Sequence, residues 1–149
     1  MNSDFERDYE LGKVDEREAA RLVCARDGVT VIHVQDEYNY RWTHYDFKMS
    51  DLRTYESKSD KKSLETGNIF VEFLDRGKPS GIAITTADYH IFKSEAFYQI
   101  PTAVLKELVK GRRTASAKNK KTKALTWGYL VPRQVFINAS VLLPPVPAV

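Results

Sequence analysis

The chain has 149 residues, of which 42% are hydrophobic, 11% aromatic and 29% charged, and its formal net charge is +3. This length and composition exclude a disordered or fibrous protein and fit one domain with a hydrophobic core. The single cysteine, Cys24, excludes an internal disulfide, and no stretch reaches the roughly 20 apolar residues of a membrane span. We therefore expect one α/β or α+β domain over residues 1–149, in a reducing cytoplasm and without a membrane partner, with Cys24 as a buried thiol.

A helix is predicted over residues 13–27, ahead of every strand. Asp15 and Glu18 have the spacing of a capping box, and Gly28 is typical of a helix end. Glu16 begins an i, i+3, i+4, i+7 pattern whose other members are Ala or Val, which defines one face of the helix. We expect this face, with Glu16 at its start, to contact a sheet.

Three strands are predicted after the helix, over residues 29–34, 41–49 and 52–58. Asp46 lies near the end of the second strand. Side chains alternate between the two faces of a strand, so Glu56 and Lys58 share one face of the third strand. A strand of this polarity either lies exposed at a sheet edge or carries chemistry.

The second half of the chain predicts a strand over residues 68–74, a hairpin of strands over 89–93 and 96–100, and a helix between Pro101 and Gly111. Residues at about 110–124 lack apolar periodicity, so we expect a flexible basic loop there. The apolar tail at about 141–149 is rich in Pro, which predicts an extended segment packed on the body of the protein or on a neighbouring subunit.

Positive charge is concentrated in and beside this loop. Eight basic residues and one acid lie between Lys106 and Lys123, a net charge of +7, whereas the rest of the chain carries −4. Such a segment predicts a polyanionic partner, because Lys and Arg contact phosphates without reading the base sequence. The candidate nucleic-acid-binding residues are Lys110, Arg112, Arg113, Lys118, Lys120, Lys121 and Lys123. The competing interpretation is a solvated loop without a partner.

The candidate catalytic residues are Asp46, Glu56, Lys58 and Glu16. Carboxylates on neighbouring strands can converge, and hard oxygen ligands suit Mg²⁺, for which Mn²⁺ can substitute. Asp46, Glu56 and Glu16 are therefore the candidate metal ligands, and the metal would activate water for attack on a phosphate. Lys58 would orient that water or neutralise charge in the transition state. The competing interpretation is a group of solvated charges on an edge strand.

These residues resemble the motif of the PD-(D/E)XK nuclease superfamily, whose core is a helix, a mixed sheet carrying D…(D/E)xK, and a further helix. Asp46, Glu56 and Lys58 match that motif, and Glu16 within DEREAARLV is similar to the first-helix acid of the Holliday junction resolvase branch. The stretch TGNIFVEFLDRGKPSGIAITTADYHIF resembles a run found in small phage-type members. The resemblance covers residues 10–110 and implies a restriction-endonuclease-like core, with a central mixed sheet flanked by helices.

Neighbouring acids compete for two of these roles. Asp51, in the turn after Asp46, is the alternative metal-binding aspartate, although its position in a turn favours Asp46. Glu10 and Glu18 are alternatives to Glu16 as the acid of the first helix. The helical face favours Glu16, and capping accounts for Glu18.

Other polar residues have less specific signals. Asn68 and Glu72 share a strand face, where they either line the cleft or carry an ordinary strand-face charge. His33, His44 and His90 lie in strand-like runs without metal-ligand spacing, so we interpret them as structural and predict no zinc site.

Together these patterns and the resemblance predict a Mg²⁺-dependent DNA endonuclease that selects DNA structure more than sequence, with Holliday-type branched DNA as the leading substrate. The resemblance implies a homodimer that cuts two strands symmetrically, in the host cytoplasm if the gene belongs to a phage. Two alternatives stay open: a nuclease for another DNA substrate, such as a nicking or end-processing enzyme, and a catalytically silent nucleic-acid-binding module of the same fold. The sequence does not distinguish DNA from RNA as a ligand.

Overall fold

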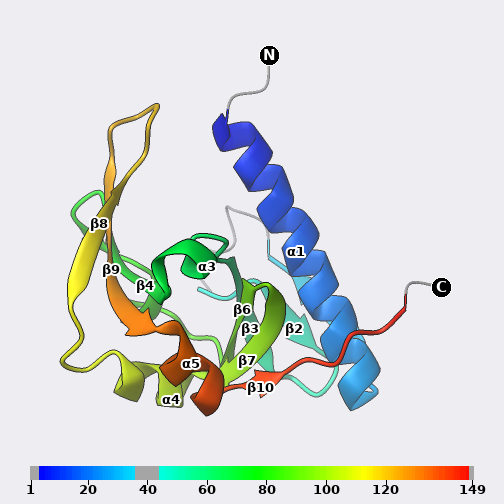
Figure 1. The fold of residues 1–149 in the computed structure, drawn as a ribbon. Helices are drawn as coiled ribbons and strands as arrows, with labels where there is room; N and C mark the ends of the chain where they lie inside the picture. The colour runs from blue at the N-terminus through cyan, green and yellow to red at the C-terminus, as the bar shows by residue number, and fades with distance from the viewer. Residues whose placement is uncertain (1–3, 36–43, 148–149) are drawn as a thin grey trace.

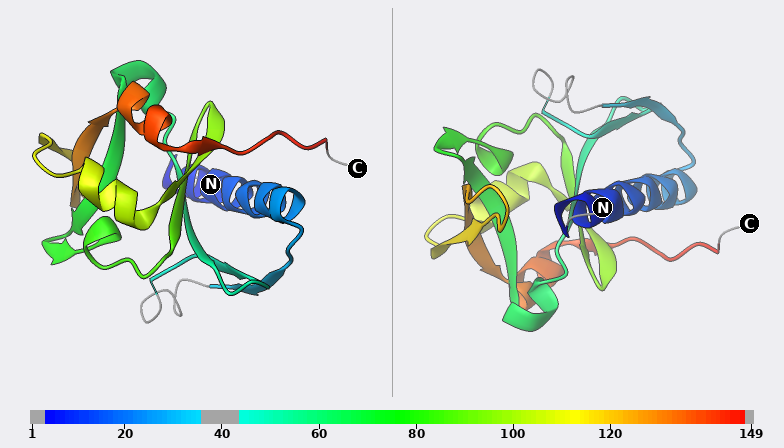
Figure 2. Two further views of the ribbon diagram at one scale, coloured as in Figure 1. Left: turned by 90° about the horizontal axis from the view of Figure 1, so that it is seen from below. Right: turned by 90° about the horizontal axis from the view of Figure 1, so that it is seen from above.

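The computed structural model describes residues 4–35 and 44–147, and for residues 4–11 the backbone alone (Figure 1). It is an α+β fold with a mixed sheet of six strands flanked by helices. Helix α1 lies on one side of this sheet and a second sheet of four strands lies on the other, as the views in Figures 1 and 2 show. No helix among the described residues is both long enough and apolar enough to cross a bilayer.

Helix α1 spans Asp4–Asp27 and is longer than the predicted helix. It ends where expected, because the Gly28 amide donates to the Cys24 carbonyl at 2.9 Å and Gly28 adopts φ +67°. The predicted capping role of Asp15 is wrong, since good helix formers in DFERDYEL carry the helix past Gly12 and leave Asp15 in its interior. Cys24 is half-buried rather than buried, with its Sγ 3.8 Å from the Met49 sulfur.

The six-stranded sheet has the order β1-β2-β3-β6-β7-β10. Its strands are β1 (Val31–Val34), β2 (Phe47–Met49), β3 (Thr54–Ser59), β6 (Tyr89–Ser94), β7 (Ala96–Pro101) and β10 (Val141–Leu142). Only β3 and β6 pair in parallel, and every other neighbouring pair is antiparallel. β2 is shorter than the predicted strand, of which residues 41–43 lie outside the described residues.

The second sheet has the order β5-β4-β9-β8 and is antiparallel throughout. Its strands are β5 (Lys78–Pro79), β4 (Asn68–Asp75), β9 (Leu125–Pro132) and β8 (Thr114–Lys118). Short helices connect the two sheets: α3 (Ser63–Thr66), η1 (Gly81–Ala83), α4 (Thr102–Leu108) and α5 (Arg133–Ala139).

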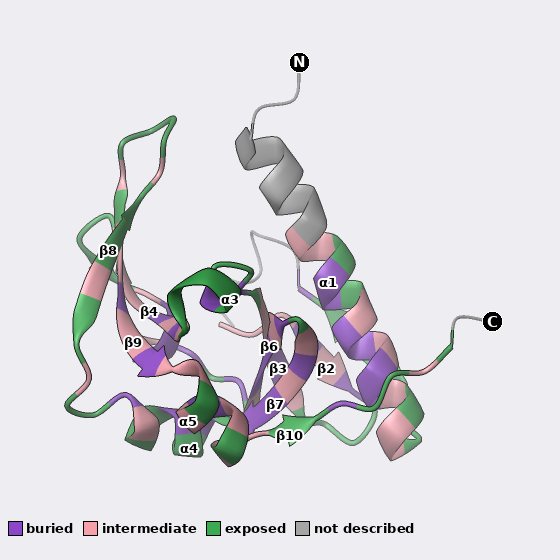
Figure 3. Ribbon diagram, in the orientation of Figure 1, coloured by how far each residue is buried: buried purple, intermediate pink, exposed green. Residues whose placement is uncertain are grey.

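Two hydrophobic cores lie on the two sides of the six-stranded sheet. The first, between α1 and the sheet, includes Ala19, Val23, Phe47, Tyr55 and Ile91. The second, between the two sheets and against α4 and α5, includes Ile69, Phe92, Leu105, Val131 and Phe136. Burial of each such large side chain stabilises the fold by roughly 1.5–3 kcal/mol. Figure 3 shows buried residues on the sheet-facing side of α1 and in the central strands.

Part of the expected basic loop is regular structure. Residues 114–118 form β8, which pairs with β9, and Asn119 orders the turn because its Oδ1 accepts hydrogen bonds from the Lys121 and Thr122 amides at 2.9 Å. The prediction of a loop relied on the lack of apolar periodicity. A strand of small and polar residues that pairs with a longer strand needs no such periodicity. The basic segment therefore ends in a β-hairpin.

The C-terminal tail is extended and lies on the body of the protein. β10 pairs with β7, and Leu143 joins the first core with 1% of its surface exposed. Arg21 of α1 donates hydrogen bonds to the carbonyls of Val146 and Pro147. The tail thus bridges the edge of the sheet and α1.

Candidate active site

Asp46 is fixed at the start of β2 by the backbone of its neighbours. Its amide donates to the Tyr55 carbonyl at 2.9 Å, and its carbonyl accepts from the Gln35 amide at 2.8 Å. The Ser57 amide donates to its Oδ2 at 2.8 Å. The carboxylate is therefore held against β3, the strand that carries Glu56 and Lys58.

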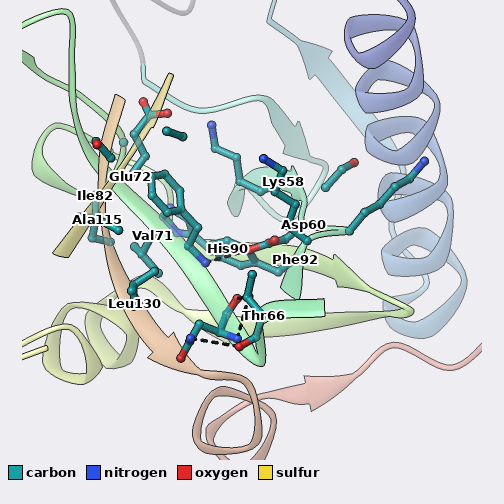
Figure 4. Close-up of a pocket in the computed structure, with 18 of the residues that line it drawn as sticks. Lys58, Asp60, Thr66, Val71, Glu72, Ile82, His90, Phe92, Ala115 and Leu130 are labelled. Atoms are coloured by element: carbon teal, nitrogen blue, oxygen red, sulfur yellow. Dashed lines mark hydrogen bonds between the residues drawn. The ribbon is translucent and has the colours of Figure 1, made fainter. Parts of the chain in front are cut away.

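One residue, Tyr55, gives strand β3 an apolar face, although the sequence of the strand is polar. Tyr55 is fully buried and stacks between Phe47 and Tyr89, with ring centroids 5.2 and 5.3 Å away. Because side chains alternate along the strand, this anchoring of Tyr55 in the first core sends Glu56 and Lys58 to the other face. That face borders a cleft of about 860 Å³ between the two sheets (Figure 4).

Glu56 is fully buried and lies beside a histidine of the next strand. The parallel register of β3 and β6 places Glu56 opposite His90, whose Nε2 is 2.9 Å from Glu56 Oε2. His90 Nδ1 is hydrogen-bonded to Thr102 Oγ1 at 2.8 Å. Both ring nitrogens of His90 thus face an oxygen atom, Nε2 that of Glu56 and Nδ1 that of Thr102. This chain of contacts fixes the orientation of the Glu56 carboxylate.

The charges of the four predicted catalytic residues act on one another. Burial, together with the nearby Glu56 carboxylate, raises the pKa of Asp46 to about 7, against the opposing effect of Lys58. Glu16 acts in the same direction as Glu56 on this pKa. Glu56, Lys58 and Glu16 therefore each lie within electrostatic range of Asp46.

Lys58 remains a strong cation in the cleft. Burial acts to lower its pKa, but the nearby carboxylates outweigh burial and raise the pKa above its ordinary value. The carboxylates are those of Glu56, Glu72, Asp46 and Asp75. Lys58 is thus protonated at neutral pH and acts as a fixed positive charge.

The geometry favours Glu16 among the acids of α1. Glu16 is buried, with 8% of its surface exposed, and its Oε2 accepts from Lys13 at 3.3 Å. Its Oε1 is buried and has no hydrogen-bond partner within the described part of the chain. Glu18 instead pairs with Arg21 at 2.6 Å, which lowers the pKa of Glu18. The side chain of Glu10 lies outside the described residues.

The remaining polar candidates fall into two groups. Asp51 is an exposed turn residue whose Oδ1 accepts from the Arg53 amide at 3.1 Å, away from the cleft. Asn68 and Glu72 both line the cleft together with Glu56 and Lys58. Gly81 of η1 supports this arrangement, because a Cβ at Gly81 would lie 2.3 Å from the Glu72 carbonyl oxygen.

The donor set has the chemistry of a site for a hard divalent cation. Its carboxylate oxygens suit Mg²⁺, and the unsatisfied Glu16 Oε1 and the raised pKa of Asp46 are both relieved by a bound cation. Among the side chains of residues 12–35 and 44–147, however, no group of three from His, Cys, Asp or Glu is close enough to form a complete ligand cluster. Mg²⁺ commonly binds one or two carboxylates and keeps several waters, so a cluster of three is not required.

The predicted nucleic-acid-binding residues occupy two ends of β8. Lys118, Lys120, Lys121 and Lys123 are exposed on the β8–β9 hairpin, and Lys118 lines the cleft. At the other end, Lys110 forms an ion pair with Glu107 at 2.7 Å, and Arg112 Nε donates to the Leu108 carbonyl. Arg113 is exposed beside Arg112. Only the hairpin end of the set lies at the cleft.

Several cleft residues were missed or undervalued from the sequence. Lys61 and Lys62 line the cleft beside Glu56, in a segment that looks like an ordinary polar loop. His90 contacts Glu56, which follows from the parallel pairing of β3 with β6 and not from local spacing. Phe70 also lines the cleft, and only its alternation with Asn68 and Glu72 indicated this.

No family model, curated protein or solved structure matches the chain. The class of the molecule is therefore defined by its own fold and site. It is an α+β protein with a mixed sheet, and this sheet places acidic residues and Lys58 at a cleft with a basic rim.

Proposed function

We propose that the protein is a metal-dependent endonuclease that hydrolyses phosphodiester bonds of DNA, as a member of the PD-(D/E)XK superfamily. One observation supports this most: the cleft bordered by Glu56 and Lys58 is also lined by Lys61, Lys62 and Lys118. A phosphodiester backbone needs cations along its path and a compact acidic group where a metal binds. Of the proposed acidic group, Glu56 lines this cavity of about 860 Å³ together with the lysines, whereas Asp46 and Glu16 are not among its lining residues.

Asp46 and Glu56 would hold Mg²⁺ or Mn²⁺, with Glu16 as the third acid. The bound metal would supply an activated water and positive charge at the phosphate. Ser57 and His90 orient the two carboxylates, since the Ser57 amide bonds Asp46 and His90 Nε2 lies 2.9 Å from Glu56. Asp46 and Glu56 are therefore each oriented by a second residue, as is common for metal ligands.

Lys58 acts in this proposal as an electrostatic group and not as a general base. Its raised pKa keeps the amine protonated, so it has no lone pair to accept a proton from water. A protonated amine beside the scissile phosphate stabilises the negative charge that develops in the transition state. The same cation orients the attacking water through its N–H donors.

The preferred substrate in this proposal is branched DNA, and the active form is a homodimer. Edge strand β1 supports a dimer, because Val31, Ile32 and Val34 are 37, 53 and 57% exposed on it. Exposed apolar edge strands pair readily with a second copy, and a two-fold dimer presents two sites to two strands.

A cleavage panel tests this function. Purified protein with Mg²⁺ is offered four-way junction, fork, nicked duplex, linear duplex and single-stranded DNA, with matched RNA as a further arm. The wild type should cut the junction fastest. Glu56→Gln keeps the shape of the side chain and Lys58→Met keeps its length, and each should reduce the rate by roughly 100-fold or more because each removes a group that acts on the transition state.

Glu107→Gln serves as the matched control, because Glu107 is 69% exposed on α4, and it should cut like the wild type. DNA binding should survive in all three variants, since the basic hairpin is intact. Binding without cleavage of any substrate by the wild type would instead establish the silent binding module. Faster cutting of nicked or linear ends than of junctions would establish the end-processing alternative.

A further inference from the structure

The wall that the four-stranded sheet contributes to the cleft has an apolar part that the proposed chemistry does not use. The cleft-lining residues of this part are Phe70, Val71, Leu130, Ala115 and Ala117, and the polar residues of the same sheet that line the cleft beside them are Asn68, Glu72, Ser116 and Lys118. Figure 4 shows Leu130 and Ala115 on one side of the cleft and Lys58 on the other. Phosphates prefer the cationic side, so a different part of the substrate must cover the apolar side.

The register of the sheet makes this wall flat around one aromatic ring. Phe70 pairs with Leu130 across β4 and β9, and Gly128 in β9 pairs with Ala115 in β8. The small residues Gly128 and Ala115 therefore lie on one side of Phe70, and its other neighbours on this face are Leu130, Asn68 and Glu72. The ring itself offers a broad, uncharged contact surface.

Gly128 fixes how the Phe70 ring lies. A Cβ at Gly128 would be 2.6, 2.7 and 2.8 Å from Cζ, Cε1 and Cε2 of Phe70. Three nearly equal distances to the far end of the ring mean that the ring lies with its face over Gly128. The backbone is anchored as well, because the Phe70 amide donates to Asp60 Oδ2 at 2.8 Å. The ring is thus supported on one face, and the residue is only partly buried.

The rim of the cleft indicates what chemistry fits this wall. Lys61 and Lys62 lie on the α3 side and Lys118 on the hairpin side of the same cavity. Cations around an aromatic platform match a nucleotide, whose phosphate is anionic and whose base has an apolar face. The volume of about 860 Å³ is ample for one nucleotide with its neighbouring phosphates.

We propose that this wall receives an unstacked base of the substrate strand and that Phe70 stacks on it. The inference rests on the proposed function and narrows its substrate class to DNA with unpaired nucleotides near the cut. A base inside a duplex keeps its neighbours and cannot present its face to a side chain without being unstacked first. Stacking does not depend on base identity, so the preference is for DNA structure and not for sequence.

A binding experiment with single abasic sites tests the contact. The Glu56→Gln protein, without metal, is titrated by fluorescence anisotropy with forked DNA in which one abasic site is moved stepwise through the unpaired arm. At one position, loss of the base should weaken binding by roughly 5-fold or more. Phe70→Leu added to this protein should bind intact DNA as weakly as the parent binds that abasic DNA, with no further loss when both changes are combined.

Two variants control for folding and for aromatic character. Phe73→Leu changes the same residue type on the same strand, but Phe73 packs against Tyr129 with ring centroids 4.5 Å apart and does not line this cleft, so it should bind like the parent. Phe70→Tyr keeps the ring face and should keep the abasic effect. Gly128→Ala should reproduce the loss, because the added Cβ displaces the ring.

The outcomes separate this inference from the proposed function. Equal weakening of forked and fully paired DNA by Phe70→Leu, or no position with an abasic effect, would overturn the base contact even if the enzyme cuts DNA. An abasic effect that depends on Phe70 would uphold it even if no substrate is cut, because binding is measured without cleavage. A protein that binds none of these DNAs would overturn it as well.

Discussion

Asp46 carries a carboxylate whose charge depends on its immediate neighbours. Glu56 and Glu16 disfavour the ionised form and Lys58 favours it, and burial shifts the balance toward the protonated acid. Asp15, one residue before Glu16, has another role: it accepts from Ser59 Oγ and Lys93 Nζ and so ties α1 to the sheet. Asp15 thus serves packing, whereas the proposed function assigns chemistry to its neighbour Glu16.

The raised pKa of Asp46 predicts a pH-dependent stability of the metal-free protein. Between 3.8 and about 7 the folded state keeps a proton that the unfolded state has released, so rising pH favours unfolding. The contribution is at most about 1.4 kcal/mol per pH unit, the value for one proton. Urea unfolding in EDTA at two pH values within this range measures how far the free energy of unfolding falls as pH rises. This fall should be smaller for Asp46→Asn than for the wild type. Equal differences would contradict the assignment.

His90 is expected to act through Glu56. His90→Leu should raise the Mg²⁺ concentration for half-maximal cleavage by roughly 10- to 100-fold, the usual effect of losing a residue that orients a metal ligand. His90→Gln can still donate from its amide and should lose much less. Mg²⁺ titrations of cleavage measure this, with thermal unfolding alongside. A purely structural histidine would lower the unfolding temperature and leave the Mg²⁺ dependence unchanged.

At the scale of elements, the sequence predicts well what local pattern determines. The end of α1 at Gly28, strand β4, the β6–β7 hairpin and helix α4 follow from turn residues and periodicity. The start of α1 and strand β8 do not, because neither has a signal that distinguishes it from its surroundings. Strand alternation and the helical face led us to expect that Glu56, Lys58 and Glu16 lie near Asp46, and all three act electrostatically on it. Their joint role in a metal site stays a prediction.

The contacts of the site depend instead on pairings that the sequence does not encode locally. The parallel pairing of β3 with β6 brings His90 to Glu56 across 34 positions of the chain. The packing of the second sheet on the first brings Phe70 and Lys118 to the same cleft as Lys58. Such contacts need the whole topology before any one of them can be stated.

The β8–β9 hairpin is expected to contribute affinity without selectivity. Changing Lys118, Lys120, Lys121 and Lys123 to Gln should weaken binding to junction and linear DNA alike. It should also reduce the magnitude of the slope of log K against log salt concentration by up to about 4, since each lost phosphate contact removes about 0.9 from the slope. Anisotropy titrations at several NaCl concentrations measure both effects.

The control for the hairpin is the double change Lys106→Gln and Lys110→Gln on and after α4. Lys110 already pairs with Glu107 at the end of β8 that is distant from the hairpin turn, so the slope should change little. Equal flattening by both sets would show that general net charge matters and the position of the hairpin does not.

At the scale of the whole molecule, the cleft lies between two sheets that share the second hydrophobic core. The six-stranded sheet is supported from behind by α1, and the four-stranded sheet by α4 and α5. Figure 1 shows the first half of α1 and the β8–β9 hairpin extending on the same side of the molecule. Glu56 and Lys58 thus come from the six-stranded sheet, and Lys118 at the rim of the same cleft comes from the four-stranded sheet.

A dimer through β1 is expected to matter only for substrates that need two cuts. Ile32→Lys places a charge on the exposed edge strand, where Ile32 is 53% exposed, and should convert the dimer to a monomer in sedimentation velocity. The monomer should still nick one strand of a junction but should lose paired cuts. Leu64→Lys, on the exposed part of α3, is the control and should remain dimeric. A wild type that is monomeric at all concentrations would contradict the dimer.

Side chains alternate between the two faces of β3, and this affects how the protein tolerates mutations. Neighbouring residues on the strand fail by different routes, because Tyr55 belongs to the first core and Glu56 to the cleft. Substitutions of Tyr55 lower the stability of the folded protein. Growth at low temperature, or second-site mutations elsewhere in the core, can therefore restore function. Under the proposed function, substitutions of Glu56 or Lys58 should leave a folded but inactive protein, which no mutation that restores stability can repair. A genetic screen would therefore find conditional alleles and null alleles at alternate codons of the same short strand.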